Sequence, residues 1–394
     1  MVITRRGVLV SGGAIAALSA LPVAAEPQTV SPAADVAKSD GSAEPVCLTD
    51  FEPLAKKKMT PMGWEYMSAG AADEISLRWN TEAYQRIRLR PRVLVDVSRL
   101  DTRITLFGQE HAFPILLAPV ASQKLAHPGG ELATARGAAA ADTTMVLSSF
   151  SNTSLEDVFA AAKSPPWFQL YMQRDRGFTR ELVQRAESAG YRALCLTVDF
   201  PLSGVRNREA RANVKLPPLP NLQGMKESKG ASLLPSGLDI YTPILDPTVT
   251  WKTIEWMRSF TKLPILAKGV LNPDDAELAI KAGTSGIMVS NHGARNLDTV
   301  PATIDALALV TERVAGRVPV LVDGGIRRGT DVLKALALGA NAVLIGRPYV
   351  WGLGVEGDTG VAKVVNILRR EFAMAMALTG RTTIASIDRT VIWS

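Results

Sequence analysis

The sequence predicts an α/β protein folded as a single (β/α)8 barrel, also called a TIM barrel, and two observations support this fold class. From Phe113 onward, short apolar runs alternate with helix-like stretches, which is typical of a parallel α/β fold. There are eight apolar runs, and eight repeats of strand and helix favour a closed barrel over an open sheet. The runs are residues 115–119, 144–149, 167–172, 194–199, 264–270, 286–293, 318–325 and 342–348.

The stretches between the apolar runs have the features of helices. Clear examples are residues 131–141, 180–189, 274–282 and 330–338. Gly190, Gly283 and Gly339 follow three of them, and a glycine just past a helix is a common C-terminal cap because it adopts left-handed backbone angles without strain. Strands as apolar as these need cover on both faces, so we expect the helices to surround the barrel.

One connection between the predicted strands is much longer than the others. After Asp199, at the end of the fourth run, the fifth run does not begin until Pro264. Residues 213–248 in this connection contain six prolines and little helical pattern, which predicts a long loop after strand four. Such a loop at the catalytic end of a barrel is often a lid, although disorder is an equal alternative. Before the first strand we expect an N-terminal helical extension.

The N-terminus has the pattern of an export signal. Arg5 and Arg6 precede an apolar stretch, residues 7–23, that ends in small residues. The paired arginines resemble a twin-arginine signal, which exports folded proteins to the periplasm. We therefore expect a twin-arginine-type signal peptide over residues 1–25, a flexible leader over 26–47 and one barrel domain over 48–394. An uncleaved anchor or an ordinary N-terminus is the alternative.

The composition argues against two classes of partner. Lys and Arg total 44 against 38 Asp and Glu, a net charge of +6, and removal of Arg5 and Arg6 leaves 6 − 2 = +4. That charge is too small and too dispersed to indicate nucleic-acid binding. The two cysteines, Cys47 and Cys195, form no CxxC pattern and no cluster with histidine, so we expect no metal site.

Polar residues collect where the predicted strands end. Barrel enzymes place their chemistry at the C-terminal ends of the strands, whereas packing alone does not explain so many reactive side chains at one rim. These residues are Ser148, Ser149, Gln169, Tyr171, Thr197, Asp199, Lys268, Ser290, Asn291, His292, Asp323, Gly346 and Arg347.

The last two strands carry the pattern of a phosphate site. Residues 322–329 read Val-Asp-Gly-Gly-Ile-Arg-Arg-Gly and open a helix, and Gly346-Arg347 follows the eighth run. Glycines let backbone N–H groups approach an anion, the helix N-terminus adds a favourable dipole, and an arginine supplies a forked cation. Barrels often bind phosphate after strands seven and eight, so we expect a phosphate-bearing ligand there.

Residues 290–298, Ser-Asn-His-Gly-Ala-Arg-Asn-Leu-Asp, resemble the signature of the FMN-dependent (S)-2-hydroxy-acid oxidases and dehydrogenases. This family includes glycolate oxidase, lactate oxidase, mandelate dehydrogenase and the flavin domain of flavocytochrome b2. The resemblance runs from about Thr49 to Ile387. Further matches, in order, are Tyr66 with Gly70, Ala118-Pro119, Ala126-His127-Pro128, Leu147-Ser148-Ser149, Gln169-Leu170-Tyr171, Thr197-Val198-Asp199, Lys268-Gly269 and Asp323-Gly324-Gly325.

The resemblance implies roles for four catalytic residues. It makes His292 the base that takes a proton from the substrate, and Asp199 the carboxylate that holds and stabilises the imidazolium. Tyr171 would form a hydrogen bond to the reacting oxygen. Lys268 would lie beside the flavin ring and stabilise its reduced, anionic form.

The resemblance also implies the residues that bind substrate and cofactor. Arg295 would clamp the substrate carboxylate, with Arg206, Tyr66 and Tyr171 as further contacts. Asn296 replaces a glutamine that is common in the signature. The implied FMN contacts are Ala118, Pro119, Val120, Ser148, Gln169, Thr197, Lys268 and Ser290 around the ring and ribityl chain, and Asp323, Gly325, Arg327, Gly346 and Arg347 toward the phosphate end.

Together these inferences predict an exported FMN enzyme that oxidises a lactate-like (S)-2-hydroxy acid to the 2-oxo acid. The reduced flavin would pass its electrons to oxygen or to a quinone or cytochrome, and analogy with relatives implies a homo-oligomer, a tetramer. Phe150 and Ser203 stand where relatives vary with substrate, so the identity of the acid stays open, as does the choice between hydride and carbanion transfer. Two alternatives remain: an FMN barrel isomerase without net oxidation, and a catalytically silent exported flavin-binding protein.

Overall fold

The computed structural model describes residues 44–225, 240, 242 and 244–393. Its core is formed by eight strands: β3 (Ile115–Leu117), β4 (Val146–Ser148), β5 (Trp167–Leu170), β6 (Leu194–Thr197), β7 (Ile265–Val270), β8 (Gly286–Val289), β9 (Val320–Asp323) and β10 (Ala342–Ile345). They pair in parallel in the order β3-β10-β9-β8-β7-β6-β5-β4. The two ends of this order meet, because Leu117 bridges to Met145 and donates to the Thr144 carbonyl at 3.0 Å. The sheet is therefore a closed barrel, which confirms the predicted fold class.

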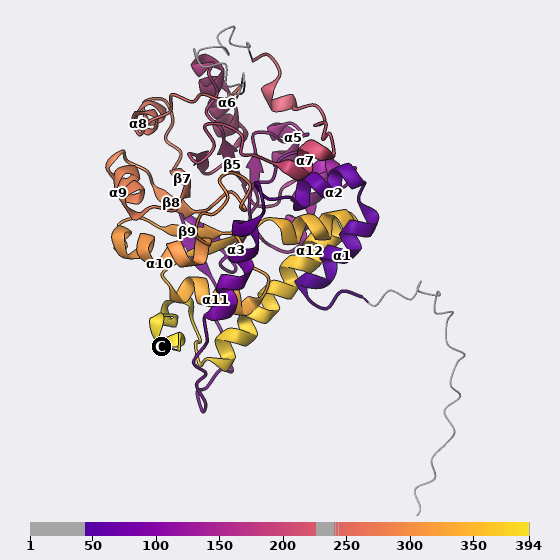
Figure 1. The fold of residues 1–394 in the computed structure, drawn as a ribbon. Helices are drawn as coiled ribbons and strands as arrows, with labels where there is room; N and C mark the ends of the chain where they lie inside the picture. The colour runs from indigo at the N-terminus through magenta and orange to yellow at the C-terminus, as the bar shows by residue number, and fades with distance from the viewer. Residues whose placement is uncertain (1–43, 226–239, 241, 243, 394) are drawn as a thin grey trace, which may run out of the picture. The chain divides into compact units, whose positions relative to one another are not determined.

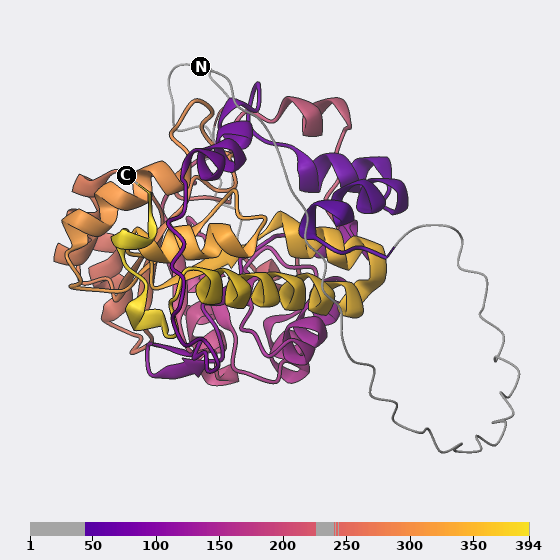
Figure 2. The ribbon, with the colours of Figure 1, turned by 90° about the horizontal axis from the view of Figure 1, so that it is seen from below.

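Helices cover the outside of the barrel, as predicted (Figure 1). They are α4 (Gly130–Ala140), α5 (Leu155–Ala161), α6 (Arg176–Ala189), α8 (Lys252–Arg258), α9 (Pro273–Lys281), α10 (Thr303–Val314), α11 (Gly329–Ala337) and α12 (Arg347–Leu378). The glycines expected as caps, Gly190, Gly283 and Gly339, have φ values of +104°, +89° and +101°. Helix α12, the long golden helix of Figure 2, is interrupted by non-helical angles at Glu356 and Gly357.

The expected N-terminal helical extension consists of α1 (Leu48–Lys58), α2 (Pro61–Ser68) and α3 (Ile75–Arg86). It is attached to the loop after β8. Asp298 accepts hydrogen bonds from the backbone N–H groups of Asp73, Ile75 and Ser76 at the start of α3, at 2.8–3.2 Å. Asn80 and Asn291 exchange two side-chain hydrogen bonds, of 3.0 and 2.9 Å. Residues far apart in sequence thus frame one side of the barrel mouth.

The long connection after β6 contains α7 (Asn207–Arg211) and a 3-10 turn, η2 (Pro220–Leu222). Helix α7 packs against α2, and the two lie side by side in Figure 1. Residues 226–239, 241 and 243, on which much of the expected lid falls, lie outside the described residues. So do the expected signal peptide over 1–25 and most of the leader over 26–47.

A small antiparallel hairpin, β1 (Ile104–Leu106) with β2 (Gln109–His111), was not predicted from the sequence. It covers the N-terminal end of the barrel, where the Phe107 ring lies 5.4 Å from that of Trp167 at the start of β5. Trp167 also donates its indole N–H to Gln109 at 2.7 Å. This end is filled by apolar packing, so a ligand site has to lie at the other end. Within the described ranges, no helix is long and apolar enough to cross a membrane.

Candidate active site

A cavity of about 580 Å³ lies at the C-terminal ends of the strands. Most of the residues that the sequence singled out line it: Tyr66, Ala118, Pro119, Val120, Tyr171, Arg206, Lys268, His292, Arg295, Asp323, Gly325, Arg327, Gly346 and Arg347. Five others, Asp199, Ser148, Gln169, Thr197 and Ser290, are not part of this lining but lie behind it in the sense that Asp199 contacts His292, Ser290 contacts Lys268, and the other three are buried at the ends of β4, β5 and β6. The cavity therefore brings together residues from α2 at one end of the chain and from α12 at the other.

His292 is held between two polar partners. Its Nδ1 lies 3.1 Å from Oδ1 of Asp199, and its Nε2 lies 3.2 Å from the hydroxyl of Tyr171. The backbone of His292 has a left-handed φ of +59°, and its N–H donates to the hydroxyl of Ser290 at 3.1 Å. A neutral imidazole that donates from Nδ1 to Asp199 carries its lone pair on Nε2, the atom beside Tyr171.

Burial and neighbouring charges together set the protonation state of the His292–Asp199 pair. Burial lowers the pKa of His292, although the negative charge of Asp199 opposes this shift. Burial would raise the pKa of Asp199, but the charge and hydrogen bond of His292, with the charge of Lys268, outweigh it and keep that pKa below its ordinary value. Around neutral pH the pair thus consists of a neutral imidazole and a carboxylate. Such an imidazole can accept a proton and be stabilised once it has done so.

A glycine on β7 makes room for Asp199. Gly269 has a φ of +107°, and a Cβ at this position would overlap the Asp199 side chain. The side chain of Asn296 also donates to the backbone carbonyl of Asp199. The two residues of the Lys268-Gly269 pair therefore have different roles: Gly269 leaves space for the Asp199 side chain, and Lys268 supplies a buried cation.

Lys268 is a buried cation whose counterion, Asp323, has one carboxylate oxygen without a hydrogen-bond partner among the described residues. Its Nζ donates to the Ser290 hydroxyl at 3.0 Å and lies 3.6 Å from Oδ2 of Asp323. Burial would lower the pKa of Lys268, but the charges of Asp323 and Asp199 raise it, so the ammonium persists. Oδ1 of Asp323 is buried and has no hydrogen-bond partner among the described residues.

Three of the five residues behind the lining form a relay across neighbouring strands. The Ser148 hydroxyl donates to Oε1 of Gln169 at 3.0 Å, and Nε2 of Gln169 donates to the Thr197 hydroxyl at 2.8 Å. All three are buried. The relay fixes the orientation of the Gln169 amide at the base of the cavity.

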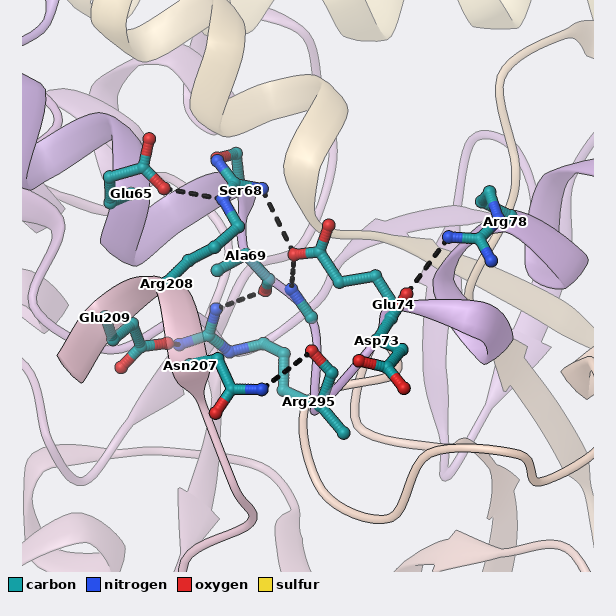
Figure 3. A network of polar contacts seen from close by, with 12 residues as sticks. Glu65, Ser68, Ala69, Asp73, Glu74, Arg78, Asn207, Arg208, Glu209 and Arg295 are labelled. Atoms are coloured by element: carbon teal, nitrogen blue, oxygen red, sulfur yellow. Dashed lines mark hydrogen bonds and ion pairs between the residues drawn. The ribbon is translucent and has the colours of Figure 1, made fainter. Parts of the chain in front are cut away.

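Two arginines share a single carboxylate. Arg295 donates from Nη1 to the carbonyl of Tyr66 at 2.7 Å. It also donates from Nη1 to the Ala69 carbonyl at 2.8 Å and from Nη2 to Oε1 of Glu209 at 2.7 Å (Figure 3). Arg206 donates from Nε to the Arg295 carbonyl at 3.1 Å, and its Nη1 lies 3.5 Å from Oε2 of Glu209. The Tyr66 ring lies 5.1 Å from the Arg295 guanidinium. This arrangement can bind a small carboxylate.

The phosphate end predicted from the sequence contains two partly buried arginines without a counterion among the described residues. Arg347 donates from Nη1 to the Gly293 carbonyl and from Nη2 to the Ala69 carbonyl, both at 2.9 Å. Its Nε is buried without a partner, and among the described residues neither Arg347 nor Arg327 forms an ion pair. Burial and the charges of Arg295 and Arg327 lower the pKa of Arg347 to about 9. Unmatched positive charge of this kind needs an anionic ligand.

The residues present fit FMN. The unmatched Arg327 and Arg347, with the start of α12 and the glycines after β9, suit its phosphate. Lys268 and the open Oδ1 of Asp323 leave one buried cation and one buried acceptor without full partners beside the cavity. These are the groups that a polar flavin edge and ribityl chain would satisfy.

Sequence reasoning assigned no role to four residues that build the site. Glu209 binds both arginines, and its only sequence signal is a position three residues after Arg206. Arg208, on the same helix, contacts Glu65, Ser68 and Glu74, at 2.6, 2.7 and 3.1 Å, and so attaches α7 to the N-terminal extension (Figure 3). The other two, Asn291 and Asp298, stand in the recognised signature and hold α3 in place.

The comparisons with known proteins agree with this geometry. Residues 55–394 match the family model described as FMN-dependent dehydrogenase. The chain is 49% identical over 350 residues to a 2-hydroxyacid oxidase of Dictyostelium discoideum, covering 88% of this chain and 90% of that one. It is 48% identical to an L-lactate oxidase of a Nostoc species, covering 87% and 97%. A solved structure of a mandelate oxidase mutant with (S)-mandelic acid has a TM-score of 0.79 at 38% identity, covering 89% and 98%.

A family match over this share of the chain, with relatives near 50% identity, leaves the isomerase and silent-binder alternatives without support. The chain belongs to the FMN-dependent dehydrogenase family and is an oxidoreductase that acts on the CH–OH group of 2-hydroxy acids with FMN as its cofactor.

Proposed function

We propose that this enzyme oxidises a lactate-like (S)-2-hydroxy acid to the corresponding 2-oxo acid, with His292 as the base. The observation that carries the proposal is the position of His292 Nε2, 3.2 Å from the Tyr171 hydroxyl, in the same cavity as Arg206 and Arg295. A base, a hydrogen-bond donor and a cationic carboxylate site in one cavity match the three polar parts of a 2-hydroxy acid.

The chain's own groups would divide the work as follows. Arg295, held by Tyr66, Ala69 and Glu209, binds the substrate carboxylate together with Arg206. Nε2 of His292 takes one proton from the CH–OH unit, and Asp199 stabilises the resulting imidazolium. The Tyr171 hydroxyl donates to the substrate oxygen. FMN, when bound, supplies the two-electron acceptor beside this base, and Lys268 provides positive charge next to it.

The rest of the cavity suits a small or medium-sized apolar side chain. Phe150, Val214, Leu216 and Leu245 line it, and the Phe150 and Tyr171 rings lie 4.6 Å apart. Relatives named for L-lactate and for mandelate bracket the size of acid that we propose. The acceptor that we propose is oxygen or a quinone or cytochrome, and oxygen is favoured because the relatives reported above are named oxidases.

An anaerobic experiment tests this function. The FMN-loaded protein is mixed with L-lactate, D-lactate, glycolate or L-mandelate, and flavin absorbance is followed. We expect L-lactate to bleach the flavin and D-lactate to leave it oxidised, and admission of air then measures reoxidation by oxygen. If a fully loaded flavin is bleached by none of these acids, the proposal is wrong.

We also propose that residues 1–25 export the folded enzyme to the periplasm, that residues 26–47 are a leader, and that the enzyme is a homo-oligomer. The support for export is the Arg5-Arg6 pair before an apolar stretch. Replacing both arginines by lysine should retain the enzyme in the cytoplasm of a twin-arginine-competent bacterium. Unchanged periplasmic flavoprotein after that replacement would contradict the export proposal.

A further inference from the structure

One face of α7 lines the cavity. Glu209 and Ala210 of α7 line the cavity, together with Arg206, which directly precedes the helix, and Asn213, which follows it. Arg208 points to the other side of α7 and binds Glu65, Ser68 and Glu74 (Figure 3). The helix therefore contributes one anion, Glu209, directly to the part of the cavity in which we place the substrate.

Glu209 uses both of its oxygens on the arginine pair. Oε1 lies 2.7 Å from Nη2 of Arg295, and Oε2 lies 3.5 Å from Nη1 of Arg206. The three side chains are only 13–15% exposed, so solvent screens these charges weakly. Two cations and one anion leave this cluster with a net charge of +1.

The hydrogen bonds of Arg295 also leave room for one carboxylate. A guanidinium has five N–H donors, and the contacts among the described residues use three of them, on Tyr66, Ala69 and Glu209. The two donors that remain suit one bidentate carboxylate. Charge and donor number thus agree on a single carboxylate.

Among the residues that the structure describes, a second carboxylate on the same substrate would find no counterion. Beyond the arginine pair the cavity is lined by Phe150, Val214 and Leu216. Lys268 already faces Asp323 at 3.6 Å, and Arg327 and Arg347 belong to the phosphate end, which FMN occupies in the loaded enzyme. A buried charge without a partner is strongly disfavoured, and Glu209 adds repulsion from within the same cavity.

From these observations we infer that Glu209 is a specificity-determining residue: it matches the arginine pair to one carboxylate and excludes 2-hydroxy acids that carry a second. This inference rests on the proposed function, because it concerns the substrate of the same site. It assigns to Glu209 a role in selecting the substrate's charge, in addition to orienting Arg295.

The test compares two ligands of equal length. The oxidised, FMN-loaded enzyme is titrated by calorimetry with 2-oxopentanoate, which has one carboxylate, and with 2-oxoglutarate, which has two, at fixed ionic strength. Because like charges in a weakly screened cavity repel, we expect the native enzyme to bind the monoanion at least about tenfold more tightly. Equal or tighter binding of 2-oxoglutarate by the native enzyme would overturn the inference without any variant.

Substitutions then assign the effect to Glu209. Glu209→Gln keeps an acceptor for Arg295 but removes the charge, and should reduce the preference for the monoanion by about tenfold. Glu209→Asp keeps the charge and should keep the preference. Glu65→Gln is the matched control, because Glu65 belongs to the same polar network but does not line the cavity, and its preference should equal that of the native enzyme.

The outcomes separate this inference from the proposed function. If 2-hydroxy acids bleach the flavin but Glu209→Gln has the native preference between the two ligands, the specificity inference is wrong and the proposed function stands. If no 2-hydroxy acid bleaches the flavin, the proposed function fails. If, in that case, Glu209→Gln still loses the preference for 2-oxopentanoate over 2-oxoglutarate, Glu209 selects anions by charge whatever the reaction is.

Discussion

Two pairs of partly buried arginines line the same cavity, and among the described residues only one pair has a counterion. Arg206 and Arg295 share Glu209, whereas Arg327 and Arg347 form no ion pair among the described residues. The difference matches what each pair has to do. A substrate has to be released as product after every turnover, so a site already partly neutralised is an advantage. A cofactor has to stay, and its phosphate is held best where two positive charges are unmatched.

The largest effect is expected from a substitution of His292, which leaves both arginine pairs intact. Replacing His292 by alanine removes the base, and flavin reduction by the acid should slow by up to about 10⁴-fold. FMN and a 2-oxo acid should still bind, because neither ligand relies on this imidazole for its charge. Stopped-flow absorbance measures the first quantity and calorimetry the second. Rapid bleaching of this variant would show that another group is the base.

The phosphate-end pair is tested by Arg347→Gln. Loss of one partly buried cation that we assign to the FMN phosphate should weaken FMN binding by at least about 30-fold, which corresponds to roughly 2 kcal/mol. The flavin-to-protein ratio after gel filtration, and the dissociation constant from flavin fluorescence, give the result. Arg328→Gln is the control, because Arg328 is exposed and does not line the cavity. Full retention of FMN by Arg347→Gln would show that Arg347 does not hold the FMN phosphate, and the proposed difference between the two arginine pairs would be wrong.

A substitution in the substrate-end pair, Arg206 and Arg295, should weaken binding of the acid and leave FMN binding unchanged. Arg206→Gln removes one charged donor and should weaken binding of a 2-oxo acid by about tenfold, the effect of one charge-assisted hydrogen bond, while FMN retention stays native. Arg211→Gln, at the exposed end of the same helix, should change neither quantity. If Arg206→Gln instead releases FMN, the division of the cavity into two anion sites is wrong.

The smallest effect concerns pH. His292 accepts a proton only when neutral, and burial holds its pKa below the ordinary value, near 6.5. Flavin reduction should therefore be flat around neutrality and fall about tenfold per pH unit below that pKa. Asp199→Asn removes the charge that raises the His292 pKa, so the fall should begin at lower pH. A shift to higher pH in that variant would contradict the electrostatic role of Asp199.

Much of the barrel could be predicted from the sequence because its signals are local. Apolar runs of strand length and the glycines after three helices depend only on neighbouring residues, and the structure has both. The β1–β2 hairpin escaped prediction because its two strands, Ile-Thr-Leu and Gln-Glu-His, are short and partly polar and so form no apolar run.

From the pattern of strands and helices alone, the site was predictable only as far as the strand ends, and Tyr66, Arg206 and Arg295 were found only through the family resemblance. His292, Asp199 and Lys268 follow from their positions at the barrel mouth, but residues 206–211, Arg-Asn-Arg-Glu-Ala-Arg, form a run of charges whose orientation depends on contacts with α2. Nothing local distinguishes Glu209, which faces the cavity, from Arg208, which faces away. Asp298 stood in a recognised signature, yet its partners at the start of α3 lie 222 to 225 residues earlier in the chain.

The hydrogen bonds between Asn80 and Asn291 have a consequence for how the enzyme matures. They join residues 211 positions apart, and Arg347, still later in the chain, contacts Ala69. A ribosome therefore has to synthesise all eight strands and the start of α12 before the mouth of the barrel can form. FMN capture is then a step that follows translation, and a nascent chain halted before Arg347 would have no site that retains the cofactor.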